Sequence, residues 1–491
     1  MPLTARSCYV SSRDTVAKDS ARTPRPNPKR FPSATGLRVR TVRYHPSRLN
    51  RCLAAESSNS REVLTKDQSE VEVSKDDSEN GNGRAEEVGQ EEKDLGNWEN
   101  WRSGTVSVHG GERGGRPRVS DSLTTPIVQT STYRFVDTNE LIAYQEGRYG
   151  SYEYGRYGNP TTRTCEEKIK ALEGAEDCLL SASGMNSATT LLLALVPAGG
   201  HIVTTTDCYR RTRQFIQTVL PKMGISATVI DPSDIGALKK ILDEREVSLF
   251  FTESPTNPYL RCVDVPEIAR LCHENDAVVV IDSTFATPCN QKALDLGADI
   301  VIHSATKYLA GHNDVLAGVV CGKMDLVSSV RSLHNVLGGV VDPHAAYLLL
   351  RGMKTVSLRV KQHNESAMEL SKRLEAHPEV EQVWYPGLPS HPDHEIAEKF
   401  MSGFGGVVSF SIKGDLWRTA KFIDGVKLPY IAPSLGGVES LIEQPAVVSY
   451  WDIGAEARAE LGIKENLVRF SCGVEDLEDI WADMEQSLDK L

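Results

Sequence analysis

The segment His303–Tyr308 places a lysine, Lys307, directly after a short apolar stretch and beside hydroxyl side chains. The stretch Ile300–Ile302 is typical of a buried strand in an α/β sheet. Lysine is rarely buried without a partner, so one interpretation is an ordinary surface lysine at a strand end. The alternative is an amine that forms a Schiff base with an aldehyde cofactor. The rest of the chain decides between these two interpretations.

A candidate anion site follows another predicted strand, Cys178–Ala182. Gly184 and Met185 come next and open a predicted helix, where backbone N–H groups can bind an anion and a glycine allows close approach. Ser304 and Thr306, near the lysine, could donate hydrogen bonds to the same phosphate. A structural turn would explain the glycine equally well, so this segment alone is weak evidence for a binding site.

Two more predicted strands are followed by polar residues that a ring-shaped cofactor would use. Asp282 and Thr284 come after Val278–Ile281. A buried carboxylate requires a cationic partner, and the protonated nitrogen of a pyridine ring would serve. Asn257 lies between two prolines that fix its loop, and its amide could bond a phenolic oxygen. The alternatives are a helix cap or an arginine bridge for Asp282 and a rigid turn for Asn257.

An arginine inside an apolar stretch is a candidate for substrate binding. Arg469 lies within Leu467–Ser471, which predicts a strand. A half-buried arginine requires a carboxylate, and a planar guanidinium suits the bidentate capture of an amino acid. A structural salt bridge is the alternative. The polar groups of the preceding paragraphs all follow strand ends of one predicted sheet, and this joint placement favours a single site.

Short aliphatic strands alternate with helices from Thr161 onward, which predicts an α/β fold with a mostly parallel sheet covered on both faces. A long helix is predicted over 345–374, and a smaller α+β part with strands such as Val407–Ile412 follows it. The predicted strands of the first part are Cys178–Ala182, Ile202–Thr205, Ser226–Ile230, Leu249–Thr252, Val278–Ile281 and Ile300–Ile302. The predicted helices between them are Glu166–Leu172, Asn186–Leu195, Arg211–Leu220, Ile235–Glu244 and Val265–Glu274.

The beginning of the chain has a different composition. Up to about Arg51 it is rich in arginine and serine and poor in acids, which is typical of an organelle transit peptide or of a disordered basic tail. An acidic stretch without aromatics follows, and we expect a flexible linker there. The next part is expected to be an extended arm with one short helix near 138–144, packed on a neighbouring subunit. The predicted divisions are 1–55 (transit peptide), 56–97 (linker), 98–157 (arm), 158–355 (cofactor domain) and 356–491 (C-terminal domain).

Composition excludes several classes of function. The chain has 491 residues, of which 40% are apolar and 25% charged, as expected for a globular protein of two or three domains. A net charge of -12 argues against general nucleic-acid binding, and no apolar run approaches the roughly 18 residues of a membrane span. The 10 cysteines form no CxxC pair, so we expect neither a disulfide framework nor a metal site.

Seven short motifs match one known family. They are Tyr154–Thr161, Ala182–Met185, Asp207–Tyr209, Glu253–Pro258, Ser304–Tyr308, Ser434–Ser440 and Val468–Ser471. On these motifs the chain from about Val106 to Leu491 resembles the Cys/Met-metabolism family of pyridoxal 5'-phosphate (PLP) enzymes, and its plant members most of all. The resemblance implies an aspartate-aminotransferase-like fold of type I, with a large mostly parallel sheet and a smaller C-terminal α+β domain.

The resemblance also implies roles for the cofactor site. Lys307 would bind PLP covalently and act as a base, and Asp282 would pair with the pyridine nitrogen. Tyr209 would stack on the ring and assist proton transfer. Thr284 and Asn257 would complete the surroundings of the ring. The phosphate would be held by Gly184, Met185, Ser304 and Thr306.

Other residues are implied in contacts with a second subunit or with the substrate. Tyr154 and Arg156 would reach the phosphate from the neighbouring subunit, in a homotetramer built from dimers that share their active sites. Ser434 and Arg469 would hold the substrate carboxylate, and Glu439 fits members that handle cystathionine. If the donor is a phosphoester, a second anion site is needed, and the candidates are Arg148, Arg210, Arg211 and Arg213.

The expected activity is a γ-replacement that joins L-cysteine to an activated homoserine ester and gives L-cystathionine for methionine biosynthesis. The resemblance to plant members implies O-phospho-L-homoserine as the ester and the plastid stroma as the location. The first alternative is a γ-lyase of the same family that cleaves cystathionine or methionine. An alternative of another class is a non-catalytic dimeric scaffold without cofactor, although the presence of Lys307 and Asp282 argues against it.

Overall fold

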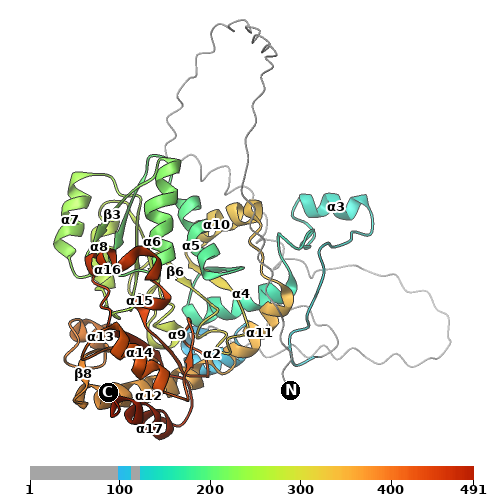
Figure 1. Ribbon diagram of the computed structural model, residues 1–491. Helices are drawn as coiled ribbons and strands as arrows, with labels where there is room; N and C mark the ends of the chain where they lie inside the picture. The colour runs from blue at the N-terminus through green and yellow to red at the C-terminus, as the bar shows by residue number, and fades with distance from the viewer. Residues whose placement is uncertain (1–97, 112–121) are drawn as a thin grey trace, which may run out of the picture. The chain divides into compact units, whose positions relative to one another are not determined.

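A computed structural model describes residues 98–111 and 122–491 (Figure 1). The predicted transit peptide and acidic linker lie outside the described residues. Two sheets organise the described part, and the strands and helices follow the predicted alternation closely. Among the described residues, none of the helices has both the length and the apolar character needed to cross a membrane.

The larger sheet has seven strands in the order β1-β7-β6-β5-β4-β2-β3. All are mutually parallel except β7, which runs antiparallel to both of its neighbours, β1 and β6. The sequence analysis missed β7, but the sheet is mostly parallel as predicted. The strands are β1 (Asp177–Ser181), β2 (His201–Thr205), β3 (Ser226–Ile230), β4 (Leu249–Glu253), β5 (Val278–Asp282), β6 (Ile300–His303) and β7 (Gly318–Gly322).

Helices cover both faces of this sheet because its strands are apolar on both sides. On β4, Phe250 packs in one core with α7 and α8, while Leu249 and Phe251 pack in another with α5 and α10. The helices of this part are α4 (Pro160–Glu173), α5 (Gly184–Leu195), α6 (Arg210–Gln214), α7 (Ile235–Glu244), α8 (Val265–His273), α9 (Thr287–Asn290) and α10 (Met324–Leu337). A π-helical turn, η3 (Phe215–Val219), and a 3-10 turn, η4 (Leu220–Met223), continue α6.

The second sheet has the order β10-β11-β12-β9-β8 and lies in the orange and red part of the chain (Figure 1). Its strands are β8 (Val380–Trp384), β9 (Val407–Ile412), β10 (Tyr430–Ile431), β11 (Leu441–Glu443) and β12 (Leu467–Ser471). The later helices are α11 (Pro343–Met353), α12 (Val356–Ala376), α13 (His394–Phe400), α14 (Leu416–Gly425), α15 (Pro445–Val448), η5 (Trp451–Ile453), α16 (Gly454–Glu460) and α17 (Leu477–Leu488).

The long helix predicted over 345–374 is wrong, because the structure divides it into α11 and α12. Gly352 lies against the loop after Lys307, where a Cβ would come within 2.2 Å of the Ala310 carbonyl oxygen. The buried Arg359 of α12 donates to the Gly352 carbonyl at 2.8 Å and to the Tyr308 carbonyl at 2.7 Å. The break therefore lets one arginine satisfy the end of α11 and the segment next to the lysine.

The arm contains more helix than predicted. Besides α3 (Thr138–Gln145), which matches the predicted short helix, the chain forms η2 (Trp98–Asn100) and α2 (Ser103–His109). Val106 of α2 is buried in the core that α4 also lines. From α4, Asn159 accepts from the Thr161 amide at 2.8 Å and donates to the Val128 carbonyl at 2.7 Å. One capping residue thus fixes both the start of α4 and the arm beside it.

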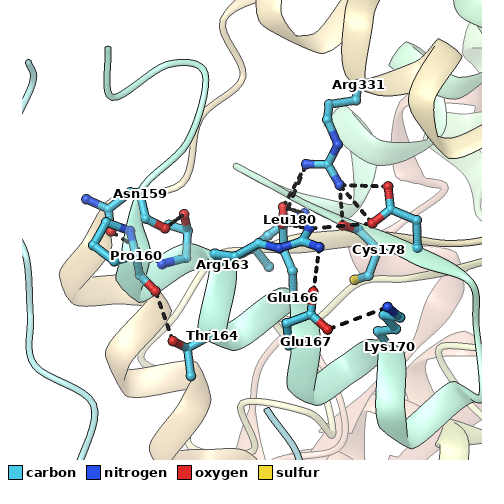
Figure 2. A network of polar contacts seen from close by, with 12 residues as sticks. Asn159, Pro160, Arg163, Thr164, Glu166, Glu167, Lys170, Cys178, Leu180 and Arg331 are labelled. Carbon is cyan, nitrogen blue, oxygen red and sulfur yellow. Dashed lines mark hydrogen bonds and ion pairs between the residues drawn. The ribbon is translucent and has the colours of Figure 1, made fainter. Parts of the chain in front are cut away.

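A buried ionic network joins α4, β1 and α10 (Figure 2). The Arg331 guanidinium lies 3.3 Å from Glu166 and 3.1 Å from Asp177, and it donates to the Cys178 carbonyl at 2.6 Å. Arg163 adds an ion pair to Glu166 at 3.0 Å. The network ties the first strand of the large sheet to the helices on either side of it.

Candidate active site

Six parallel strands of the large sheet end at the same edge, and predicted cofactor residues lie at the ends of five of them. Gly184 comes after β1, Asn257 after β4, and Lys307 after β6, while Asp282 is the last residue of β5. Tyr209 follows the fifth, β2, and begins the turn into α6. The carboxyl ends of parallel strands are where ligands of open α/β sheets bind. The structure therefore brings these sequence-predicted residues to one edge.

A chain of hydrogen bonds links the ends of β5 and β6. The Asp282 carboxylate accepts from both the amide and the hydroxyl of Thr284, at 2.9 and 2.5 Å. The Thr284 hydroxyl accepts from the Ser304 amide at 2.8 Å. Burial raises the pKa of Asp282, although the two bonds from Thr284 act in the opposite direction. A carboxylate held in this way would be stabilised by a cation at the strand ends.

The start of α5 lies close to the residues that follow β6. Gly184, Met185, Ser304 and Thr306 are together called the recess. Gly184 and Met185 are the first two residues of α5, and helix geometry leaves their N–H groups without a carbonyl one turn earlier. A Cβ on Gly184 would lie 2.8 Å from the Ser304 Cβ and 3.0 Å from its Oγ. Thr306 exchanges hydrogen bonds with the backbone of Ala317, at 3.1 and 3.2 Å. The recess combines free N–H groups, hydroxyls and the positive end of a helix, as an anion site requires.

Replacing Gly184 with alanine tests this recess. The new methyl group would collide with Ser304, and overpacking of this kind costs about 1–3 kcal/mol, which corresponds to about fivefold to 150-fold weaker binding. We expect that loss in PLP affinity, measured by cofactor fluorescence. The matched control is Gly236→Ala at the start of α7, where a Cβ meets only Asp234 at an ordinary 3.5 Å. Equal PLP affinity in the two variants would contradict the assignment of the recess.

Lys307 is half-buried and faces residues of the C-terminal part of the chain. Its Nζ donates to the Ser434 hydroxyl at 2.7 Å. Arg469 donates to the Ser434 carbonyl at 2.9 Å and to the Asn257 side chain at 3.2 Å. Ser434 has a φ of 137°, which non-glycine residues rarely adopt and which is concentrated at functional sites. Lys307, Asn257 and the two residues predicted to bind the substrate carboxylate, Ser434 and Arg469, are therefore one connected cluster.

Glu443 is a further member of this cluster that the sequence motifs did not predict. It lies directly opposite Arg469 in the β11–β12 pair, and the Arg469 guanidinium is 3.0 Å from its carboxylate. Both side chains are buried. The available signal was an acid at the end of the apolar stretch Leu441–Glu443, together with the expectation that a buried arginine requires a carboxylate.

The surroundings of Lys307 make its amine less basic. Burial lowers the pKa of Lys307 to about 8, and the Arg469 charge contributes in the same direction, while Glu443 opposes them. An ordinary lysine has a pKa near 10.4, so this amine is neutral in a far larger fraction of molecules at neutral pH. A neutral amine can act as a nucleophile or a base.

Tyr209 projects from the same edge, and its ring is 44% exposed. Its backbone N–H donates to the buried Glu253 carboxylate at the end of β4. Burial and the neighbouring Asp282 charge raise the pKa of Glu253 well above its usual range. An exposed aromatic ring at this edge of the sheet is suited to stacking on a planar ligand.

Several predicted residues lie apart from the Lys307 cluster. Arg156 donates to the Asn335 carbonyl at 2.5 Å and lies over the rings of Tyr154 and Tyr157. Within residues 98–111 and 122–491, no hydrogen bond or ion pair joins Tyr154 or Arg156 to Lys307 or Asp282. Glu439 accepts from Asn313 at 2.8 Å, in the loop that follows Lys307.

The four candidate arginines for a second anion site have different partners. Arg148 pairs with Glu146, and Arg210 pairs with Asp452 at 2.7 Å. Arg213 donates to the Thr206 carbonyl and to Gln217. Arg211 is exposed and donates to the neutral Gln214 at 2.9 Å.

Comparison with known proteins identifies the family. The family model described as Cys/Met metabolism PLP-dependent enzyme matches residues 104–489, most of the chain. The chain belongs to this family. The family uses PLP, and the strand-end residues fit that cofactor. They offer a helix start at Gly184 where no side chain would cover the backbone N–H groups, a carboxylate at Asp282 and an amine of lowered pKa at Lys307.

Individual relatives agree with the family assignment. The chain is 63% identical over 388 residues to "Cystathionine gamma-synthase 1, chloroplastic" of Nicotiana tabacum, covering 79% of this chain and 72% of that one. It is 61% identical to the protein of the same name from Arabidopsis thaliana, covering 79% and 69%. The crystal structure of a cystathionine gamma-lyase from Lactobacillus plantarum, complexed with L-serine, has a TM-score of 0.73 at 36% identity and covers 79% of this chain and 99% of that one. The type I fold with its mostly parallel sheet is thus confirmed.

Proposed function

We propose that this protein is a cystathionine γ-synthase that joins L-cysteine to an activated homoserine ester. The observation that carries the proposal is the 63% identity to the tobacco γ-synthase, which covers 388 residues and 79% of the chain. The Lys307 cluster supplies the amine, the carboxylate-binding arginine and the anion recess that this reaction needs.

The residues at the strand ends would hold PLP as the family resemblance implies. The phosphate would lie in the recess at Gly184, with the N–H groups of α5 and the Ser304 and Thr306 hydroxyls as donors. Asp282, oriented by Thr284, would keep the pyridine nitrogen protonated, and Tyr209 would cover one face of the ring. When bound, PLP withdraws electrons and stabilises negative charge beside the α-carbon of an amino acid.

The substrate residues act around this group. Arg469 would bind the substrate carboxylate, and its contacts to Ser434 and Asn257 fix the orientation of the guanidinium. Lys307, once displaced from the cofactor, would remove a proton from the α-carbon and then one from the β-carbon, so that the γ-substituent can leave and the cysteine thiol can add. Its lowered pKa leaves the free amine partly neutral near pH 7–8, as a base requires.

O-Phospho-L-homoserine is the proposed donor, as the resemblance to the plant members implies. The chain is 63% identical to a plant relative, and a cluster of arginines that could bind a phosphate follows Tyr209. Of the four candidates, Arg148 and Arg210 already face carboxylates. Arg211 and Arg213 have neutral partners, but Arg213 is also held by the Thr206 carbonyl, so Arg211 is the proposed anchor of the γ-phosphate.

A product assay with cysteine and each of O-phospho-, O-succinyl- and O-acetylhomoserine tests the proposed function. We expect cystathionine to form fastest from the phosphoester. Release of an α-keto acid from cystathionine or methionine, without γ-replacement, would instead identify a γ-lyase. A purified protein that shows no visible cofactor absorbance even after PLP is added would indicate a non-catalytic scaffold.

The proposal extends to assembly and location. The arm, with Tyr154 and Arg156 held away from Lys307 of the same chain, fits a role in the active site of a neighbouring subunit, within a homotetramer. The proposed domain division follows the two sheets, with the cofactor domain at 158–355 and the C-terminal domain at 356–491. The chloroplastic relatives and the basic first segment support location in the plastid, and we place the enzyme in its stroma.

A further inference from the structure

The carboxylate of Glu443 faces the positive groups of the site rather than solvent. Glu443 is 2% exposed and Arg469 is 6% exposed, and they are paired across two antiparallel strands. Arg469 is 3.0 Å from Glu443 and also contacts the backbone of Ser434. The side chain of Ser434 in turn accepts from Lys307. Both cations therefore contact Ser434, and the one anion, Glu443, pairs with Arg469.

The charge balance at this point depends on Glu443. Arg469 and Lys307 are the charged groups that act on its carboxylate, and both favour its ionised form, although burial raises the pKa of Glu443 overall. A buried cation without a counter-ion is strongly unfavourable. Before a substrate carboxylate arrives, Glu443 is the anion in contact with Arg469. A bound substrate adds a second anion to the same guanidinium.

We propose that Glu443 is a positioning residue that acts as the resident counter-ion of Arg469 and Lys307, and that it weakens carboxylate binding at Arg469 so that amino acids can exchange. The proposal rests on the proposed function only in taking Arg469 as the carboxylate-binding residue. This role differs from merely orienting the Arg469 guanidinium. A residue that only orients the guanidinium would strengthen carboxylate binding, whereas a competing counter-ion weakens it.

The sign of each effect follows from Coulomb's law. When Glu443 is neutral, a carboxylate at Arg469 no longer meets a like charge, so its binding becomes tighter. The same change removes an anion near Lys307, whose pKa already lies below the usual value through burial and Arg469 and would fall further. Because the free amine is the base, the acid limb of the pH profile should move to lower pH.

The test compares Glu443→Gln with the unaltered holoenzyme, with propionate as a plain carboxylate probe. We expect the dissociation constant of propionate, measured from its thermal stabilisation of the holoenzyme, to fall about tenfold. The acid limb of the kcat profile should move down by about half a pH unit to one unit. Glu443→Asp keeps the charge and should stay within about threefold of the unaltered enzyme. Glu465→Gln, which faces the buried Arg458 at 2.8 Å, is the matched control and should change neither value.

The outcomes separate the alternatives. Weaker propionate binding in Glu443→Gln with an unmoved acid limb would overturn the proposal and leave Glu443 as a support for Arg469. Unchanged propionate binding would also overturn it. If the variant does not fold, the replacement test is proton uptake when propionate binds to the unaltered holoenzyme, measured from binding heats in buffers of different ionisation enthalpy. A second anion beside Glu443 should raise the pKa of its carboxyl, so protons should be taken up. No uptake would refute the role of Glu443 as a competing counter-ion. Propionate binding needs no homoserine ester, so a wrong donor assignment would leave these results intact.

Discussion

Replacing Lys307 with alanine is expected to give a folded protein whose turnover falls by at least about a thousandfold. A positioned general base contributes about 10²–10⁴ in rate, and this residue is proposed to hold the cofactor as well. Folding should survive, because the change removes a half-buried cation that lies near Arg469 and makes one hydrogen bond, to Ser434. Steady-state assays and circular dichroism measure the two halves of the prediction.

Sodium borohydride adds a second measurement for Lys307→Ala. In the unaltered enzyme it should attach PLP to the peptide that contains residue 307, and in the variant that bond should be absent. The control is Lys323→Ala, directly after β7, because the Lys323–Asp299 pair at 2.6 Å is exposed on the lysine side and contributes little to stability. Normal turnover by Lys307→Ala would refute the assignment of the whole site.

The sequence was sufficient for most of the large sheet. Its strands are short, aliphatic and bounded by turn residues, and two of the predicted elements, β3 and α7, have the observed bounds. The strand β7 was missed because Gly318–Gly322 begins and ends with glycine. Both glycines lie where another chain segment approaches, and a Cβ at Gly318 would come 2.0 Å from the Ser183 carbonyl oxygen. Such close approaches are tertiary facts, and local propensity does not record them.

The site was predictable to the extent that its residues follow strands of one sheet. Lys307, Asp282 and Gly184 could be placed together because the carboxyl ends of parallel strands share an edge. Glu443 lies in the other sheet and Ser434 in the loop between its strands β10 and β11, so the hydrogen bond from Lys307 to Ser434 depends on how the two sheets pack. The chain separates these residues by more than a hundred positions, so no local pattern joins them. The family resemblance supplied Ser434 and supplied no role for Glu443.

A second large effect is expected at Arg331, on stability instead of catalysis. Arg331→Met would leave the buried Glu166 and the partly buried Asp177 with Arg163 as their remaining cation (Figure 2). Removing one partner of a buried ion pair costs about 3–5 kcal/mol, and the partial exposure of Arg331 and Asp177 places this network near or below about 3 kcal/mol. We expect a loss of that size in the free energy of unfolding, measured by urea denaturation with tryptophan fluorescence.

The loss in free energy of unfolding caused by Arg331→Met should be smaller at low pH than at neutral pH. Burial alone would raise the pKa of Asp177, but Arg331, with further help from the Cys178 amide and Arg163, holds it below its usual value. This depressed pKa contributes stability above the pKa of an unfolded aspartate, about 3.9, which is lost as the pH falls through the folded-state pKa. Without Arg331, burial has the larger effect on Asp177 and raises its pKa, so protonation of this carboxylate at lower pH removes the unfavourable buried charge from the variant. The difference in free energy of unfolding between the variant and the unaltered protein should therefore become smaller as the pH falls from 7 toward about 4.

Arg270→Met is the matched control for Arg331→Met, because it also removes an arginine that faces two carboxylates. Arg270 lies 2.7 Å from both Glu267 and Glu274 on the exposed side of α8. Water solvates all three charges there, so the control should lose far less of its free energy of unfolding than Arg331→Met does. Equal losses from the two variants would show that burial does not set the strength of the α4–β1–α10 network. A loss at Arg331 that stays constant between pH 7 and 5 would show that its effect comes from packing alone.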